Sequence, residues 1–186
     1  MYDAKELKEL RSAVAAMGDP KKPRKKWEGP THPWRKDVLQ QELELLGKYG
    51  LRNKRELWIA KSLLRRMRAR ARALLALPEE VREARARPLI NHLYSMGFLH
   101  SIEATLSDVL RLSVEDILER RLQTIVYKKG LAKSLFQARQ LIIHGHIAIG
   151  SRRVRSPGYL VSRDEEPLVG FYPLSPYVRA QETVSM

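Results

Sequence analysis

Apolar side chains recur every three or four positions through most of the chain, and this spacing predicts a mainly helical protein. The longest stripe covers residues 52–77. Pro78 ends it, because proline lacks the backbone N–H that a helix interior needs. Shorter helices are predicted over residues 4–17, 37–48, 78–88 and 89–97.

Local end signals mark two further helices in the second half of the chain. Ser113 can cap a helix that runs to Tyr127, and Gly130 follows it as a stop. Ser134 has the spacing of a capping box and opens another helix, which Gly145 closes.

The period of the pattern changes from helical to alternating after this last helix. Residues 146–149 alternate, Gly150 and Ser151 give a turn signal, and residues 152–154 complete a predicted hairpin. A further strand is predicted over residues 159–161. The pattern as a whole predicts an α+β fold, in which a mainly helical part with an extended arm precedes a small module of two helices packed on short strands.

These changes of pattern divide the chain into five segments. They are an N-terminal extension (1–16), an arm with the first helix (17–51), a helical region (52–112), a small α/β module (113–165) and a C-terminal tail (166–186). Met17 is a second candidate start, which leaves open whether residues 1–16 are an upstream extension.

The net charge of the chain indicates which class of partner it binds. Lys and Arg number 35 against 21 Asp and Glu in 186 residues, a formal net charge of +14, which favours a polyanionic partner. The chain has no cysteine, which excludes disulfides, thiolate zinc sites and cysteine nucleophiles. No apolar run approaches the roughly 20 residues of a membrane-spanning helix, so no membrane partner is expected.

The arm combines cations with aromatic rings and prolines. Four prolines between residues 20 and 36 prevent a regular helix there. Trp27 and Trp34 either stack on unpaired bases or pack on the helices that follow, and the sequence leaves both alternatives open. The cations expected to meet phosphates are Lys21, Lys22, Arg24, Lys25, Lys26, Arg35 and Lys36.

The long predicted helix is unusually one-sided in charge. It carries nine cations, and Glu56 is its only acid, so like-charge repulsion remains that a polyanion would relieve. Arg65, Arg68 and Arg72 fall on one face, whereas Met67 is expected in the core. The candidate phosphate contacts are Arg52, Lys54, Arg55, Lys61, Arg65, Arg66, Arg68, Arg70 and Arg72.

Motifs that suggest other chemistry are incomplete. His144 and His146 lack the third or fourth ligand that a metal site needs, so a hinge or RNA-backbone role is favoured. Residues 145–150 have the two glycines of a phosphate-binding loop, but Ser151 and Arg152 replace its Lys-Ser/Thr pair. Because no catalytic constellation is present, we expect no enzyme activity, cofactor, metal or small-molecule substrate.

Five stretches resemble known RNA-binding proteins. Residues 121–130 read RLQTIVYKKG, and with ARQLI at 138–142 and HGHI at 144–147 they resemble an S-four RNA-binding module. Residues 42–58, ELELLGKYGLRNKRELW, and PLSPY at 173–177 are similar to the universal small-subunit ribosomal protein four family in its archaeal and eukaryotic form.

The resemblance implies a cytoplasmic, structural component of the small ribosomal subunit. Such a protein binds small-subunit rRNA directly, helps to organise its 5′ domain during assembly, and touches neighbouring small-subunit proteins and mRNA near the channel entrance. The alternative is a paralogous assembly factor bound to pre-rRNA or a small nucleolar RNA. RNA-modifying enzymes also carry the module, but this chain leaves almost no residues for a catalytic domain.

The resemblance also implies which residues of the module meet RNA. Ser134 either caps its helix alone or also contacts RNA, since a helix N-terminus suits phosphate. The implied contacts are Arg121, Lys128, Lys129, Lys133, Ser134, Gln137, Arg139, Gln140, His144, Arg152, Arg153 and Arg155.

Overall fold

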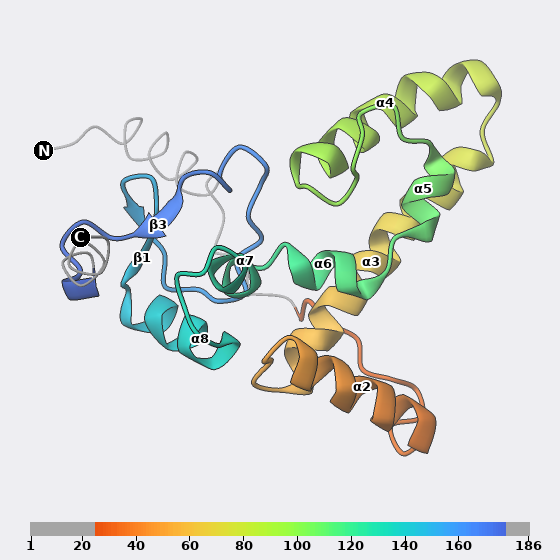
Figure 1. The fold of residues 1–186 in the computed structure, drawn as a ribbon. Helices are drawn as coiled ribbons and strands as arrows, with labels where there is room; N and C mark the ends of the chain where they lie inside the picture. The colour runs from red at the N-terminus through yellow and green to blue at the C-terminus, as the bar shows by residue number, and fades with distance from the viewer. Residues whose placement is uncertain (1–24, 178–186) are drawn as a thin grey trace, which may run out of the picture.

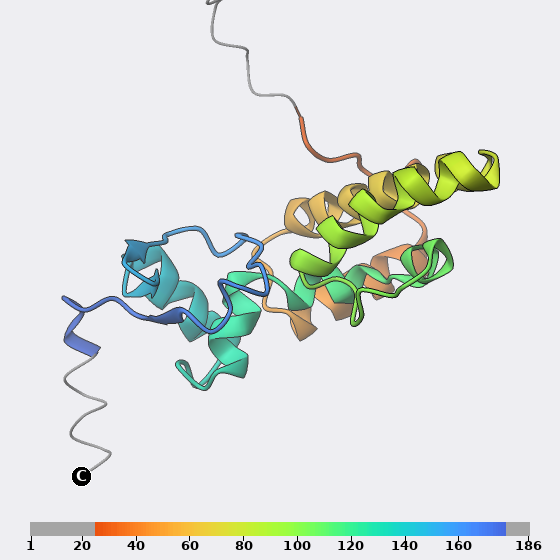
Figure 2. The same ribbon diagram turned by 90° about the horizontal axis from the view of Figure 1, so that it is seen from above.

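The computed structural model describes residues 25–177. The predicted helix over residues 4–17 and the expected contacts of Lys21, Lys22 and Arg24 lie outside this range. An elongated molecule is formed by two regions, a helical region and a smaller module (Figures 1 and 2).

Five helices build the helical region and two helices with three strands build the module. The helical region contains α2 (Lys36–Lys48), α3 (Lys54–Leu75), α4 (Glu79–Ser95), α5 (Leu106–Arg111) and α6 (Val114–Glu119). The module contains α7 (Leu122–Lys128), α8 (Leu135–His144), β1 (Ile147–Ile149), β2 (Arg152–Arg153) and β3 (Val169–Phe171).

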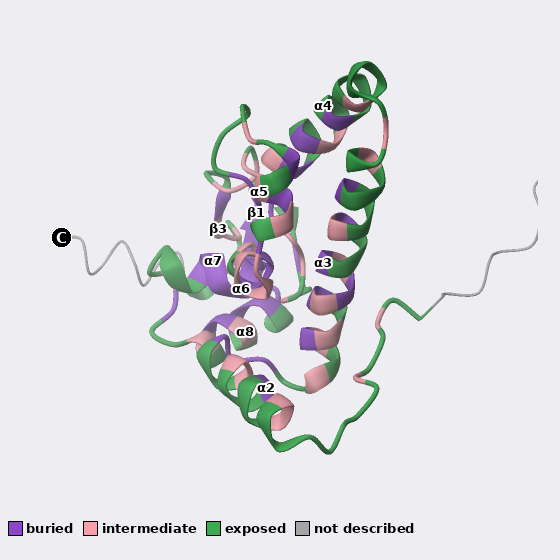
Figure 3. Cartoon of the chain, turned by 90° about the vertical axis from the view of Figure 1, so that its right-hand side faces the viewer, coloured by how far each residue is buried: buried purple, intermediate pink, exposed green. Residues whose placement is uncertain are grey.

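Helix α3 packs against the four other helices of the helical region. It begins where the Asn53 side chain accepts a hydrogen bond of 3.1 Å from the backbone N–H of Glu56. Its apolar stripe lies against the other helices, so that Leu57 and Ala71 are fully buried and Met67 is only 8% exposed, as predicted. Figure 3 shows buried residues along one side of α3 and exposed residues along the other.

Two apolar cores are present, one in each region. The core of the helical region extends from Tyr49 to Leu118 and is built by helices and their connections. The module core extends from Leu122 to Val169 and joins α7 and α8 to the sheet. The sequence therefore folds around two hydrophobic centres.

The two short helices predicted over residues 78–97 are a single helix in the structure. Pro88 lies inside α4, and its side chain is exposed. Ala86 before the proline and Ile90 and Leu93 after it are buried in the same core. Packing on both sides of Pro88 therefore holds the helix together across the missing backbone hydrogen bond.

The helix predicted from Ser113 to Tyr127 is in fact two helices. Its start is as predicted, because Ser113 and Asp116 form a capping box. The break comes at Arg121, which pairs with Leu160, while the backbone N–H of Leu122 donates to the Tyr159 carbonyl at 2.8 Å. A segment distant in the sequence thus takes the hydrogen bonds that would have continued α6.

The sheet has the order β2-β1-β3 and is antiparallel throughout. The predicted hairpin is confirmed, with Ile149 opposite Arg152 across the turn. The predicted strand over residues 159–161 is wrong, since that segment makes only the single bridge to Arg121. The third strand instead comes from β3, within the segment predicted as a tail, and it pairs Ile147 with Phe171.

No helix among residues 25–177 is both long and apolar enough to cross a membrane.

Candidate nucleic-acid interface

Four cations of α3 line a hollow where α3 meets the start of α6. The hollow has a volume of about 320 Å³. Its lining consists of Lys61, Leu64, Arg65, Arg68, Arg72 and Val114. The structure thus brings the three predicted arginines together with Lys61, and we call these four cations the α3 surface.

The arginines of the α3 surface differ in their exposure. Arg65 and Arg72 are exposed, whereas Arg68 is half-buried and donates from Nη2 to the carbonyl oxygen of Leu112. Arg68 therefore also ties α3 to the connection between α5 and α6. Arg52, Arg55, Arg66 and Arg70 are exposed elsewhere on the same region.

The two tryptophans of the arm occupy different environments. The Trp27 ring lies 5.2 Å from the Trp58 ring between centroids, and the ammonium of Lys25 lies 4.0 Å from the Trp27 centroid. This geometry favours the packing alternative for Trp27. Trp34 is 88% exposed, so its ring faces solvent and remains a candidate for stacking on a base.

Two further arm cations, Lys26 and Arg35, are exposed, as is Lys36 at the start of α2. They lie outside the hollow. The structure thus leaves these three cations as separate candidates for phosphate contact.

Glu42 of α2 is a buried carboxylate to which the sequence reasoning assigned no chemistry. It is 1% exposed and accepts from Trp58 Nε1 at 3.0 Å and from Lys61 Nζ at 2.9 Å, while Lys54 Nζ lies 3.4 Å away. Burial raises the pKa of Glu42, but the hydrogen bonds from Lys61 and Trp58 outweigh it and hold the pKa below its usual value. The signal in the sequence was an acid on the inward face of α2, one turn after Leu39.

Glu56 joins the two regions. Its carboxylate accepts from Arg121 Nη2 at 2.6 Å and from Arg139 Nη2 at 2.6 Å, so one acid of α3 holds two arginines of the module. Burial raises the pKa of Glu56, but the hydrogen bond from Arg139 and the charge of Arg121 hold it below its usual value. Beside this group, Gln123 Nε2 donates to the Gly50 carbonyl at 2.9 Å.

This junction corrects the expectation for Arg121. The side chain was expected at RNA, but Arg121 is 6% exposed and its guanidinium is paired with Glu56. Burial lowers the pKa of Arg121, and its negative partner opposes that effect. Arg139, at 17% side-chain exposure, is likewise largely held inside. The sequence signal was Glu56 itself, the single acid among nine cations.

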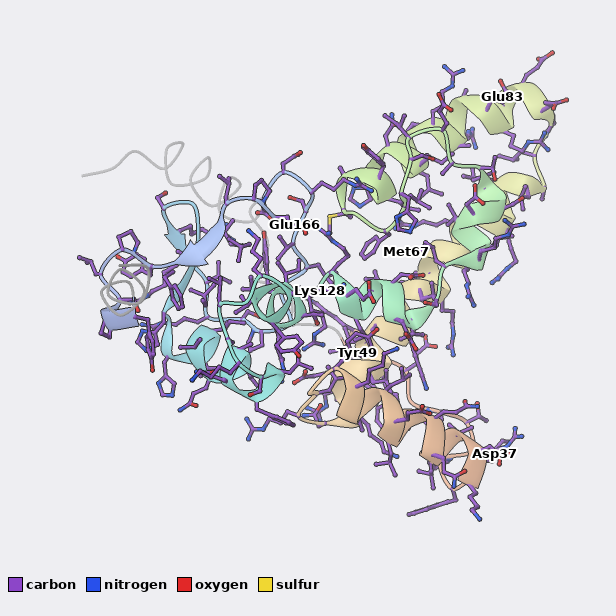
Figure 4. The ribbon with its side chains drawn as sticks, viewed as in Figure 1. Asp37, Tyr49, Met67, Glu83, Lys128 and Glu166 are labelled. Carbon is purple, nitrogen blue, oxygen red and sulfur yellow. The ribbon has the colours of Figure 1, made fainter. Side chains whose placement is uncertain are left out.

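Lysines near the junction also have internal partners. Lys128 pairs with Glu119 at 3.2 Å, and Lys129 Nζ donates to the carbonyls of Pro167 at 3.3 Å and Val169 at 3.1 Å. Figure 4 labels Lys128 beside Glu166, on the side of the module that faces α4. Lys128 therefore pairs with the end of α6, and Lys129 contacts the segment that leads into β3, in addition to any contact with RNA.

Two further cations of the module, Arg153 and Arg155, lie over the end of α8. Arg153 and Arg155 approach Gly145 so closely that a Cβ there would lie 3.1 Å from each side chain. His144 precedes this glycine and Gln140 lies one turn earlier, and both are exposed. We call these four residues, Gln140, His144, Arg153 and Arg155, the module surface. Lys133 and Arg152 are also exposed, at the start of α8 and on β2 respectively.

Ser134 caps α8, as both alternatives for this residue require. Its hydroxyl accepts from the backbone N–H of Gln137 at 3.2 Å, and Gln137 Oε1 accepts from the backbone N–H of Lys133 at 2.7 Å. Both polar side chains are therefore used at the start of the helix. The capping role leaves a simultaneous RNA contact of Ser134 as a proposal.

The two histidines have separate environments. His146 Nδ1 lies 3.1 Å from Ser175 Oγ, and its ring lies 4.9 Å from the Tyr177 ring between centroids. His144 is exposed. Within residues 25–177, no three His, Asp or Glu side chains are grouped as a metal site requires.

Comparison with known proteins agrees with this architecture. A family model described as the ribosomal protein S4/S9 N-terminal domain matches residues 18–119, and one described as the S4 domain matches residues 120–166. The small ribosomal subunit protein uS4 of Ignicoccus hospitalis is 63% identical over 163 residues, which cover 88% of this chain and 98% of that protein. The uS4 proteins of Hyperthermus butylicus and Sulfurisphaera tokodaii are 63% and 62% identical, over 88% and 87% of this chain and 92% and 91% of their own lengths. The chain therefore belongs to the uS4 family of small ribosomal subunit proteins.

Proposed function

We propose that this protein is a structural component of the small ribosomal subunit that binds small-subunit rRNA directly through two surfaces. The α3 surface presents Lys61, Arg65, Arg68 and Arg72 around a hollow. The module surface presents Arg153 and Arg155 over the end of α8. Cations gathered in this way suit the phosphates of a folded RNA, which is recognised largely by its shape and backbone.

The observation that carries this proposal is the junction at Glu56. One carboxylate of α3 holds Arg121 and Arg139 of the module, so the two surfaces are held in a defined relation. When RNA binds one surface, its neighbouring segment reaches the other at a high effective concentration. A protein of this design favours the RNA conformation that satisfies both surfaces, which is what assembly of rRNA requires.

The finer role follows from the family. We infer that the RNA segment is the 5′ domain of small-subunit rRNA and that binding nucleates its assembly. We also infer that the protein lies near the mRNA channel entrance, beside neighbouring ribosomal proteins. The role is structural rather than catalytic, because the named relatives are ribosomal subunit proteins.

Salt dependence of RNA binding tests the two surfaces separately. The variants R65Q/R72Q and R153Q/R155Q each remove two cations from one surface, and binding to a 5′-domain rRNA fragment is measured over a salt series. Each pair should lower the slope of log K against log salt by up to about 1.8 units, because each phosphate contact contributes about 0.7 to 0.9. Arg68 stays unchanged because it also supports the fold.

The matched control is R82Q/R111Q, which removes two arginines that lie outside both surfaces and pair with Glu79 and Asp108. This control should keep the full slope. An unchanged slope in either test pair would show that the corresponding surface does not contact the RNA.

Co-sedimentation distinguishes a ribosomal component from an assembly factor. Tagged protein is followed through ribosomal particles over a salt series, and crosslinked RNA is sequenced. Enrichment in mature small subunits, with crosslinks in the 5′ domain, supports the proposal. Enrichment in precursor particles alone would indicate the assembly factor instead.

A further inference from the structure

Two of the four cations that line the hollow of the α3 surface are already held in place. Glu42 fixes Lys61 at 2.9 Å, and the Leu112 carbonyl fixes Arg68. Arg72 makes no ion pair with any residue of the range 25–177. No acidic side chain contributes to the lining.

Such an arrangement is suited to one compact anion. Cations that are held before a ligand arrives lose little conformational freedom when it binds. A guanidinium offers parallel N–H groups that match two oxygens of a phosphate, and an ammonium adds a point charge. Arg65 and Arg72 at the rim are exposed and can close on the anion.

Arg65 already forms an ion pair within the protein. The carboxylate of Glu28, in the arm, pairs with the Arg65 guanidinium, and the side chains of this pair are 67% and 64% exposed. The Glu28 backbone N–H also donates to Ser62 Oγ at 2.9 Å, and neighbouring Trp27 packs on Trp58. The arm is thus anchored independently of its ion pair.

An exposed ion pair of this kind is weak. Exposed carboxylate–guanidinium pairs contribute little to stability, because water and salt screen both charges. A phosphate at Arg65 that also meets Arg68 or Arg72 of the lining gains contacts that the Glu28 carboxylate lacks. The phosphate should therefore displace the carboxylate from Arg65, while the backbone contact with Ser62 keeps the arm in place.

We propose that the hollow is a receptor for a single phosphate group of an RNA backbone, and that Glu28 is its resident competitor in the free protein. This inference rests on the proposed function, since it names one contact within the α3 surface. It assigns Glu28, an acid in a basic arm, a role in setting the affinity of the site.

Inorganic phosphate is the probe that tests the receptor. The full-length protein is titrated with phosphate at constant ionic strength, and the arginine Nε–H signals are followed by NMR. Signals of Arg65 and Arg72 should shift with a common saturation curve. R72Q should weaken phosphate binding about tenfold, because a charge-assisted hydrogen bond is lost. E28Q should strengthen it about threefold, because the competing charge is gone.

The matched control is R82Q, which removes an arginine that pairs with Glu79 away from the hollow. It should leave phosphate affinity unchanged. Equal weakening by R72Q and R82Q, or no gain in E28Q, would overturn the receptor. In that case R65Q/R72Q can still lower the salt dependence of rRNA binding. The proposed function would then stand, while this inference would fail.

Discussion

Cations of the same chemical type have different partners in the helical region and in the module. On α3, Arg65 and Arg72 lie at the rim of an open hollow. In the module, Arg121 and Arg139 turn inward to Glu56. The net charge of the chain indicates a polyanionic partner, but the position of a few acids decides which cations can reach it.

The acids that hold cations of the two regions, Glu42 and Glu56, act differently in the two places. Glu42 holds lysines that remain partly exposed, with side chains of Lys54 and Lys61 at 29% and 35% exposure. Glu56 holds arginines that are largely buried, with side chains at 8% and 17% exposure. Glu42 therefore positions lysines whose charge stays at the surface. Glu56 instead draws two arginines away from the surface and joins the two regions. Experiments on stability and on RNA binding should separate these roles.

The largest effect on stability is expected from Glu56→Gln. This change leaves Arg121 buried without a counter-charge, and loss of one partner of a buried ion pair costs about 4 kcal/mol. Chemical denaturation measures the loss. Glu119→Gln, which removes the partner of exposed Lys128, is the control and should leave the free energy of unfolding unchanged. Equal stability of the two variants would show that Glu56 does not lock the regions together.

Gly50→Ala should destabilise the same junction by about 3 kcal/mol. Gly50 has a φ of +58°, and its added Cβ would lie 2.8 Å from Leu135 Cβ, so backbone strain and overpacking combine. Gly130→Ala is the matched control, because Gly130 has a φ of +72° but no atom within 4 Å of the new Cβ. It should cost only about 1 to 2 kcal/mol, from strain alone. Both losses are measured by chemical denaturation. Equal losses of stability in the two variants would contradict the close packing around Gly50.

Lowering the pH should reduce the free energy of unfolding, because Glu42 and Glu56 take up protons. Both carboxyl groups have a pKa below the usual value in the folded protein, so the unfolded chain takes up protons first as the pH falls. Stability should be constant above the ordinary glutamate pKa of about 4.3 and decline below it. Glu56→Gln should reduce the steepness of this decline by up to about 1.4 kcal/mol per pH unit. The free energy of unfolding of the unchanged protein and of Glu56→Gln is measured by denaturation from pH 3 to 7. Parallel declines would show that groups other than Glu56 cause the acid sensitivity.

The smallest change tests the start of α8. Ser134→Ala should lose about 1 kcal/mol of stability, because the N-cap hydrogen bond to Gln137 disappears. Ser134→Asp keeps the cap but adds a negative charge, so it should retain stability. RNA affinity that falls in the aspartate variant indicates a phosphate beside Ser134. Full affinity in that variant means that the serine is a cap only.

Signals local in sequence were sufficient for many elements. Ser113 and Ser134 cap their helices, and the Gly150 turn joins the two strands of the hairpin. The apolar stripe of α3 also predicted which of its sides is buried. Each of these features is decided by residues within a few positions of one another, which is what periodicity and capping patterns report.

The features that sequence reasoning missed depend on distant partners. The break at Arg121 needs the Tyr159 carbonyl, and strand β3 needs β1 to pair with. The inward positions of Arg121 and Arg139 depend on Glu56, which lies in another region of the fold. No local pattern distinguishes an arginine that meets a phosphate from one that meets a buried carboxylate, because both need the same donor geometry.

Strand β3 has a consequence for the time course of synthesis. The buried core of the helical region ends at Leu118, whereas the module sheet waits for Phe171. At the usual 5 to 20 residues per second, the interval between these two residues takes about 3 to 10 s. During those seconds a nascent helical region can fold with α3 complete, before the sheet of the module can form. The helical region can therefore fold and meet RNA before the module does.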